Sequence, residues 1–301
     1  ELVLPKSRAA TPLPAVLFLS ATGQEDRHGF AGPPVVDLGS HEITDALAAA
    51  GFAVLRYDER GRGASEAVIA TSQPGFLDQL GDAKRALATL MVQSEVDPDR
   101  VIVVGHGEGG LRALLLASER PKDVHAIALL GTPGRPYEQV LREQARERLV
   151  DVPPEMRSHV ESEQKRMIDE LVRGNPPPEL RPQAKWLAEI FAVRPAELAG
   201  RVRVPLFIAQ GEKDFEVDPV ADSTALVRAA KRGKTKVELH RYAQLDHLFK
   251  PESETSSPAR YLVPDRRVDP AFLADLVAWA RAITKRRPDR SAPAGAPAAR
   301  R

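Results

Sequence analysis

The sequence predicts an α/β fold built on a mostly parallel, doubly wound sheet. Two observations carry this prediction: short, continuously apolar runs recur along the 301 residues, and stretches with helical periodicity lie between them. Strands that are apolar throughout are buried on both faces, as in a parallel sheet covered by helices. A chain of this length buries one large core, with or without an inserted segment.

The apolar runs predict six strands, and the segments between them predict the covering helices. The strands are expected at 15–20 ("AVLFLS"), 51–58, 100–105, 124–131, 204–211 and 236–242. The helices are expected at 41–50, 76–92, 108–118, 220–231 and 270–284. In sheets of this kind the ligand binds beyond the carboxyl ends of the strands, so candidate site residues are sought in the turns that follow them.

Residues 137–200 interrupt the alternation of strand and helix. They contain polar helical sequence such as "YEQVLREQARERLV", punctuated by "DVPPE" and "GNPPPELRP". We interpret this segment as a lid of two to four helices over the carboxyl ends of the strands, inserted into a core formed by residues 1–136 and 201–284. A peripheral, solvated helical hairpin is the alternative. Residues 285–301 are rich in Pro, Ala and Arg and are expected to form a disordered basic tail.

The composition gives no sign of a macromolecular partner. The 43 Lys and Arg residues balance 42 Asp and Glu residues, so no overall field favours nucleic acid or an anionic membrane. No apolar run is long enough to span a bilayer, and we expect a soluble chain. Residues 1–20 show no signal-peptide pattern. Since the chain starts at Glu1 without an initiating Met, we expect a processed or excised portion of a longer product, cytoplasmic or exported. The sequence gives no oligomeric state.

The segment "RVIVVGHGEGGLRALLLA" (100–117) combines a strand, a Gly-rich turn and a helix. In a nucleophile elbow, G-x-S-x-G, small residues flank the serine because strand and helix almost touch. Here Gly105 and Gly109 occupy the flanking positions, and Gly107 stands at the central one. Gly-rich turns before helices also bind phosphates, but "GHGEGG" lacks the G-x-G-x-x-G spacing of a dinucleotide site.

Three motifs together resemble the α/β-hydrolase family, in particular its bacterial esterase and peptidase-like branch. The elbow of that branch reads GHSEGG; "LRYDERGRGAS" (55–65) is similar to its RYDxRGxGxS turn, and "ATGQEDRHG" (21–29) to its GSGxxDRxG loop. The resemblance covers most of the chain. It implies an α/β-hydrolase fold and a Ser–Asp–His triad acting on small-molecule esters, with amides or thioesters as lesser options. It implies no cofactor, and the absence of Cys excludes a thiolate metal site, so we expect no metal.

The family order of nucleophile, acid and histidine points to the two remaining triad positions. The run "VPLFIAQGEKDFEVDP" (204–219) ends a buried strand in a turn similar to the family's acid turn, which gives Asp214 as the acid and Asp218 as its reserve. The run "YAQLDHLFK" (242–250) resembles the family's histidine loop and gives His247. In such a triad the imidazole moves the proton between nucleophile and leaving group, while the acid fixes its tautomer.

The resemblance also implies an oxyanion hole made by the backbone N–H groups of Glu108 and Thr22. The side chain of Glu108 is expected either to accept hydrogen bonds beneath the site or to face solvent. Asp58 and Arg60 are expected to brace the loop after their strand. Within the helical segment, an apolar cluster at helical spacing either lines an acyl pocket or attaches the segment to the core, and it consists of Trp186, Leu187, Ile190 and Phe191.

Glycine at position 107 excludes an acyl-enzyme at the usual place, because it has no side chain. Three interpretations stay open. The chain is a serine hydrolase whose nucleophile has been replaced, naturally or deliberately, and is then inactive or strongly impaired. Alternatively it is a non-catalytic module that binds a ligand or partner, or a hydrolase that uses another nucleophile or a water activated by His247. One loss among otherwise coherent motifs favours the first interpretation.

Overall fold

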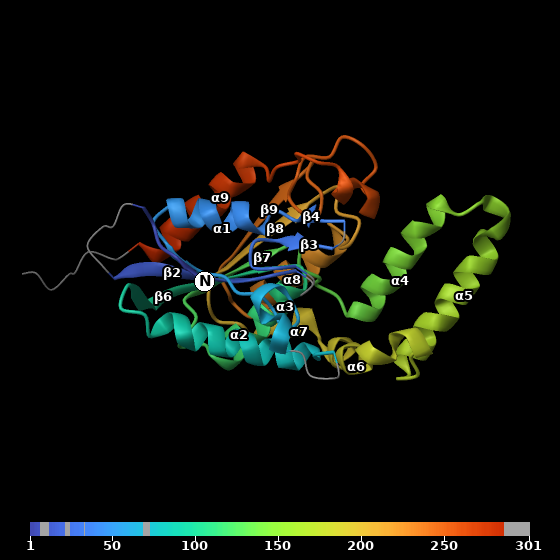
Figure 1. Ribbon diagram of the computed structural model, residues 1–301, viewed down its shortest axis with the longest axis horizontal. Coiled ribbons are helices and arrows are strands. Elements are labelled where there is room, and N and C mark those ends of the chain that lie inside the picture. The colour runs from blue at the N-terminus through green and yellow to red at the C-terminus, as the bar shows by residue number, and fades with distance from the viewer. Residues whose placement is uncertain (7–11, 22–24, 33, 69–72, 286–301) are drawn as a thin grey trace, which may run out of the picture.

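The computed structural model describes residues 1–6, 12–21, 25–32, 34–68 and 73–285. Its main feature is a seven-stranded sheet in the order β1-β5-β2-β6-β7-β8-β9 (Figure 1). Only the β1–β5 pairing is antiparallel in this sheet, and the other neighbours run parallel. The prediction of a mostly parallel, doubly wound sheet is therefore confirmed.

All six expected strands are present, with shifted ends. They are β2 (Leu13–Leu19), β5 (Ala53–Leu55), β6 (Val96–His106), β7 (Ala126–Leu130), β8 (Leu206–Gly211) and β9 (Val237–Tyr242). Three further strands were not expected: β1 (Leu2–Val3), and β3 (Phe30–Ala31) with β4 (Val36–Asp37), which pair in a separate hairpin. Two-residue strands are too short to show a hydrophobic period, so the sequence carries no signal for them.

Helices cover both faces of the sheet (Figure 1). The helices α1 (Ser40–Ala49) and α9 (Pro270–Thr284) bury their apolar residues on one face. The opposite face is covered by α2 (Phe76–Met91), α3 (Glu108–Glu119), α7 (Pro195–Arg201) and α8 (Ala221–Arg232). Because successive strand residues point to opposite faces, Val103 joins one apolar core and Val104 the other.

The chain between β7 and β8 contains the helical segment expected at 137–200. It comprises α4 (Tyr137–Glu147), α5 (Pro154–Val172) and α6 (Ala184–Ala192), with 3-10 turns at Arg148–Asp151 and Pro178–Gln183. Figure 1 shows α4 and α5 projecting from the sheet as an antiparallel pair, and α6 leading back to the core. The following helix, α7, packs among the core residues beneath α3 and α8.

Two further 3-10 turns, Gly63–Val68 and Pro258–Leu262, lie in the loops after β5 and β9. None of the helices in the described ranges combines the length and the apolar character that crossing a membrane requires. The expected basic tail falls at 286–301 apart from Lys285, and so lies outside the described residues.

Candidate active site

The turn between β6 and α3 has the geometry of a nucleophile elbow. β6 ends at His106 and α3 begins at Glu108, so a single residue, Gly107, reverses the chain. Its backbone angles are φ 52° and ψ −118°, a conformation that a residue with a side chain adopts only under strain. Gly109 lies so close to the Leu19 carbonyl of β2 that a Cβ would collide with it. The sequence of small residues therefore fits the tight approach of strand and helix.

A side chain at position 107 would face the imidazole of His247. Its Cβ would lie 3.3 Å from the Nε2 atom of His247 and 3.3 Å from the Cβ of Ala21. Both contacts are tight but allow a small group. The structure thus brings Gly107 and His247 together in the order in which a triad nucleophile and its base are arranged.

Asp214 and His247 form a buried, fully hydrogen-bonded pair. The Nδ1 atom of His247 lies 2.8 Å from Oδ2 of Asp214, and both side chains are almost completely enclosed. The same Oδ2 accepts a hydrogen bond from Gln210, while Oδ1 accepts from the backbone N–H groups of Glu216 and Val217. This carboxylate can only accept, so His247 donates from Nδ1 and directs Nε2 toward Gly107.

The reserve acid, Asp218, has a different position. Its Oδ1 accepts hydrogen bonds from the backbone N–H groups of Val220 and Ala221 at the start of α8. An Asp in this position satisfies N–H groups that have no partner within the helix. Asp218 therefore caps a helix and does not contact His247.

His106 supports His247, a contact that the sequence did not indicate. The ring of His106 stacks on the ring of His247 with centroids 4.8 Å apart, and its Nε2 lies 2.9 Å from the His247 backbone carbonyl. Burial, helped by the charge of His247, lowers the pKa of His106 to about 3, so its ring is neutral and donates from Nε2. Its neighbour in the chain is Gly107, but its side chain is absent from the lining of the cavity.

Of the two expected oxyanion donors, Thr22 lies outside the described residues. The other, the backbone N–H of Glu108, belongs to the first turn of α3, where such groups lack an acceptor within the helix. The described start of the Thr22 loop is held by Glu25, whose carboxyl accepts from the Ala21 N–H at 2.9 Å and from the Ser40 hydroxyl at 2.7 Å. Burial raises the pKa of Glu25 to about 7.

A buried ion pair fixes the strand end before this loop. The Arg112 side chain, which is fully buried, pairs with Glu59 and donates to the Ser20 carbonyl at 2.7 Å. The Ser20 hydroxyl donates to the same Glu59 carboxylate at 2.8 Å. Since Arg112 lies on α3, this network ties the elbow helix to the loop after β2. The sequence does not predict this network, because nothing in "GGLRALLLA" distinguishes a buried Arg from an exposed one.

The expected brace of the loop after β5 is present in part. Asp58 accepts hydrogen bonds from the Arg27 backbone and guanidinium and from the Ala64 N–H. Arg60 pairs instead with Asp82 on α2, and it lines the cavity. Asp58 therefore braces the loop after β5, whereas Arg60 connects that loop to α2.

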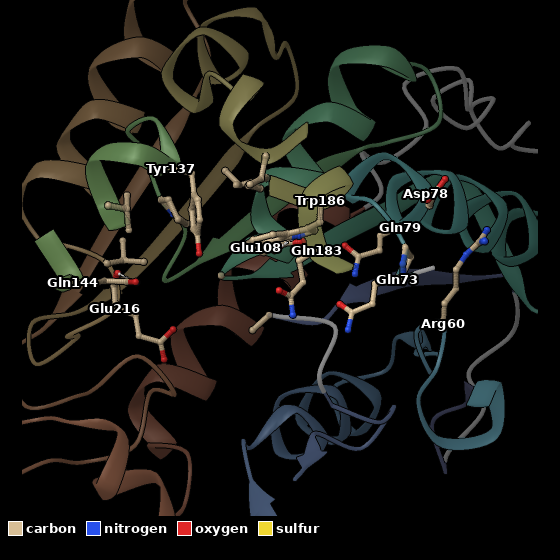
Figure 2. Close-up of a pocket in the computed structure, with 18 of the residues that line it drawn as sticks. Arg60, Gln73, Asp78, Gln79, Glu108, Tyr137, Gln144, Gln183, Trp186 and Glu216 are labelled. Carbon is tan, nitrogen blue, oxygen red and sulfur yellow. Dashed lines mark hydrogen bonds between the residues drawn. The ribbon is translucent and has the colours of Figure 1, made fainter. Parts of the chain in front are cut away.

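A cavity of about 590 Å³ opens beside Gly107 and His247, between the carboxyl ends of the strands and the inserted helices. Glu216 and Gln144 lie at one end of it and Arg60 and Asp78 at the other (Figure 2). Among the described residues that line it, Tyr137 alone carries a hydroxyl group.

Glu108 connects the elbow to the inserted helices. Its Oε2 accepts a hydrogen bond from the indole N–H of Trp186 on α6 at 3.1 Å, as the dashed line in Figure 2 marks. Burial raises the pKa of Glu108 to about 7. Of the two expectations for this side chain, acceptance of hydrogen bonds within the site is the one that the contacts match.

The four apolar residues proposed for an acyl pocket separate into two groups. Trp186 and Ile190 line the cavity. Leu187 is buried without lining it, and Phe191 packs against Tyr137 with ring centroids 6.0 Å apart. One face of α6 thus borders the cavity while neighbouring positions attach the helix to the core.

Outside the cavity, ligand atoms of Asp37, His41 and Glu42 lie within 4.8 Å of one another. The ammonium group of Lys250 is 3.9 Å from the Asp37 carboxylate, and the guanidinium of Arg267 is 4.0 Å from Glu42. These two cations neutralise the acidic groups and oppose binding of a metal ion there.

Comparison with known proteins identifies the family of the chain. Residues 39–254 match the family model described as serine aminopeptidase, S33. The chain is 26% identical over 282 residues to the esterase EstD of Thermotoga maritima, a match that covers 93% of this chain and 64% of that protein. The chain thus spans less than two thirds of the length of this curated relative.

Solved structures show the same fold. The Pyrococcus furiosus esterase PF2001 superposes with a TM-score of 0.59 and 16% identity, covering 92% of this chain and 83% of that one. A lipase in its open form superposes with a TM-score of 0.61 and 19% identity, covering 95% and 94%. The predicted α/β-hydrolase fold is confirmed, and since the family model matches well over half of its length, the chain belongs to the serine aminopeptidase S33 family of α/β hydrolases.

Proposed function

We propose that this chain is a serine-hydrolase-type carboxylester hydrolase in which glycine occupies the place of the nucleophile. The observation that carries the proposal is the alignment of Asp214, His247 and Gly107: a carboxylate 2.8 Å from Nδ1, and on the other side of the ring a backbone turn whose Cβ would lie 3.3 Å from Nε2. That order is the one required to move a proton from a hydroxyl at position 107 to a leaving group.

The roles of the remaining groups follow from this assignment. The N–H of Glu108 and that of Thr22 would stabilise the oxyanion, and α4 to α6 would act as a lid over the cavity. Trp186 and Ile190 would contact the acyl group of a small ester, in keeping with an esterase among the relatives. No acyl-enzyme forms at position 107, so the chain is expected to hydrolyse esters slowly, through attack by water.

Ligand binding without chemistry is the second candidate function. It is favoured by the lining of the cavity, in which no Ser, Thr, Cys or Lys is present among the described residues. The one hydroxyl, on Tyr137, is a poor nucleophile because burial and nearby carboxylates raise its pKa further above the ordinary value of 10.

Hydrolysis of a short-chain aryl ester by the unaltered chain and by Gly107→Ser separates the two functions. The hydrolase proposal predicts that serine raises kcat/KM by about 10³-fold or more, and that His247→Ala removes the gain. A folded Gly107→Ser variant with no gain would favour the binding module.

A further inference from the structure

The imidazole of His247 lies between two carboxylates. Asp214 contacts Nδ1, and Oε2 of Glu216 lies 3.9 Å from Nε2. Glu216 also lines the cavity that contains Gly107, at the end shown with Gln144 in Figure 2. A distance of 3.9 Å is too long for a direct hydrogen bond but suits a water molecule that bonds to both atoms.

Three contacts hold Glu216, one to its carboxylate and two to its backbone. The Tyr261 hydroxyl donates to Oε1 at 2.6 Å, which leaves Oε2 to face His247. The Glu216 N–H donates to Asp214 at 2.8 Å, and the Gln144 side chain on α4 donates to the Glu216 carbonyl at 2.8 Å. Burial and the neighbouring carboxylate raise the pKa of Tyr261 well above its ordinary value, so the phenol stays a donor.

The charges around His247 favour its protonated form. Burial opposes the positive charge, but Asp214 and Glu216, followed by Asp246 in the same loop, outweigh it and raise the pKa of His247. The stacked ring of His106 is neutral, and Tyr261 and Tyr137 are uncharged phenols. A protonated imidazole can donate a proton but cannot take one. In a chain without a serine at position 107, the base nearest to Nε2 is therefore Glu216.

We propose that Glu216 is the general base, and His247 the general acid, of a direct hydrolysis of esters that requires glycine at position 107. The inference rests on the proposed function. Oε2 of Glu216 takes a proton from water as the water oxygen bonds to the ester carbonyl carbon, which forms a tetrahedral oxyanion. The bond to the leaving oxygen then breaks as Nε2 of His247 protonates that oxygen. The proton that Glu216 took from water then passes to Nε2 of His247 through a second water, which restores both groups.

This path and a serine mechanism use the same space in different ways. A side chain at position 107 would place its Cβ 3.3 Å from Nε2, so it would compete with a bridging water for the space beside that atom. With serine present, the hydroxyl is the nucleophile and His247 must act first as a base. Glu216 should therefore matter for the unaltered chain and matter little for Gly107→Ser.

The test is ester hydrolysis by Glu216→Gln in both backgrounds, with Glu212→Gln as the matched control. Glu212 is an exposed carboxylate on the same loop, outside the cavity lining. In the unaltered chain Glu216→Gln should lower kcat about 10²-fold, as loss of a general base does, while KM and the Glu212→Gln variant stay unchanged. In Gly107→Ser the same substitution should change the kcat reached at high pH, where His247 is neutral, by less than about 5-fold, since the serine path does not use this carboxylate as a base.

The pH profile provides a second readout, which a structural role of Glu216 would not produce. The slow activity of the unaltered chain should fall as pH rises through the raised pKa of His247, because the general acid is lost. The activity of Gly107→Ser should rise over the same range, because its base appears. Equal losses from Glu216→Gln in both backgrounds, parallel pH profiles, or an unaltered chain no faster than its His247→Ala variant would each overturn the inference.

Failure of the proposed function would be recognised separately. If Gly107→Ser is active and the unaltered chain shows no activity that depends on Glu216, the hydrolase assignment stands and the role of Glu216 is wrong. If folded Gly107→Ser and the unaltered chain are both inactive toward esters, the hydrolase assignment fails, and the role of Glu216 fails with it.

Discussion

A side chain at position 107 would place its Cβ 3.3 Å from the Nε2 atom of His247, which is itself bonded through Nδ1 to Asp214. Glycine at this point separates two properties that the elbow normally combines, a strained backbone and a reactive hydroxyl. The backbone turn is present, and the hydroxyl is not. The consequences for stability and for chemistry can be measured apart from each other.

The backbone of Gly107 predicts a loss of stability when serine is introduced. With φ at 52° and ψ at −118°, a side chain brings strain that glycine avoids. We expect Gly107→Ser to lower the free energy of unfolding by about 1–3 kcal/mol in urea denaturation. The control is Gly81→Ser on α2, a position with room for a side chain. A Cβ there would lie 3.7 Å from the end of the Arg85 side chain, which is an ordinary contact distance. A Gly107→Ser variant as stable as that control would contradict the strained geometry.

The contacts of Asp214 and Asp218 predict opposite effects of removing each carboxylate. In the Gly107→Ser background, Asp214→Asn should lower kcat by about 10⁴-fold, because His247 loses the acceptor that fixes its tautomer. Asp218→Ala should leave kcat within about 3-fold of its value before the substitution. It should lower the free energy of unfolding by about 1 kcal/mol, because a helix cap is lost. Kinetics and denaturation of the two variants check this. A large loss of kcat in Asp218→Ala and a small one in Asp214→Asn would identify Asp218 as the triad acid instead.

The hydrogen bond between Trp186 and Glu108 should report the ionisation of Glu108. Burial raises the pKa of this carboxyl to about 7, so the indole faces a neutral acid below that pH and a carboxylate above it. In a Trp279→Phe variant, which leaves Trp186 as the one tryptophan, emission should titrate with a midpoint near pH 7. Adding Glu108→Gln should abolish the transition. A titration that persists in the double variant would assign it to another group.

Glu25 should make the protein less stable as pH rises. Burial raises its pKa from 4.5 to about 7, so between these values the folded chain holds a proton that the unfolded chain has released. The free energy of unfolding then falls with increasing pH, by ~3 kcal/mol for a shift of this size. Because Glu108 has a similar shift, and the pKa values of His106 and His247 are shifted in opposite directions, Glu25→Gln should remove part of the pH dependence and leave the rest.

Urea denaturation at pH 5 and pH 8 measures that dependence. Glu212→Gln, which alters an exposed carboxylate, should keep the full difference between the two values. If Glu25→Gln also keeps the full difference in stability between pH 5 and pH 8, the prediction is wrong. The Glu25 carboxyl would then be ionised, not neutral, when it accepts the hydrogen bond from Ala21.

The sequence allowed the sheet and the elbow to be predicted because both depend on local patterns. Continuous apolar runs mark buried parallel strands, and the spacing of Gly105 and Gly109 marks a tight strand-to-helix turn. The resemblance supplied Asp214 and His247, and the structure brings these two side chains into contact. Their catalytic roles, like that of Thr22 outside the described residues, stay predictions.

The supporting contacts could not be predicted because they join residues distant in sequence and of ordinary type. His106 and His247 are separated by 141 positions, and Glu59 and Arg112 by 53. The periodicity of the sequence does not distinguish a buried, hydrogen-bonded Arg or His from an exposed Arg or His that has no partner. Glu216 stands two residues after Asp214 in "DFEVD", where charged and apolar residues alternate. Its position near Nε2 of His247 depends on the conformation of the folded loop, which this pattern does not predict.

Labelling with a fluorophosphonate tests most directly the claim that position 107 is the nucleophile's place, served by His247. The reagent forms a covalent bond with a serine whose hydroxyl is activated by a neighbouring base. Mass spectrometry should find one adduct on Gly107→Ser, on the peptide that contains residue 107. Neither the unaltered chain nor Gly107→Ser with His247→Ala should carry it. A folded Gly107→Ser variant that stays unlabelled, or that is labelled at another residue, would contradict the account.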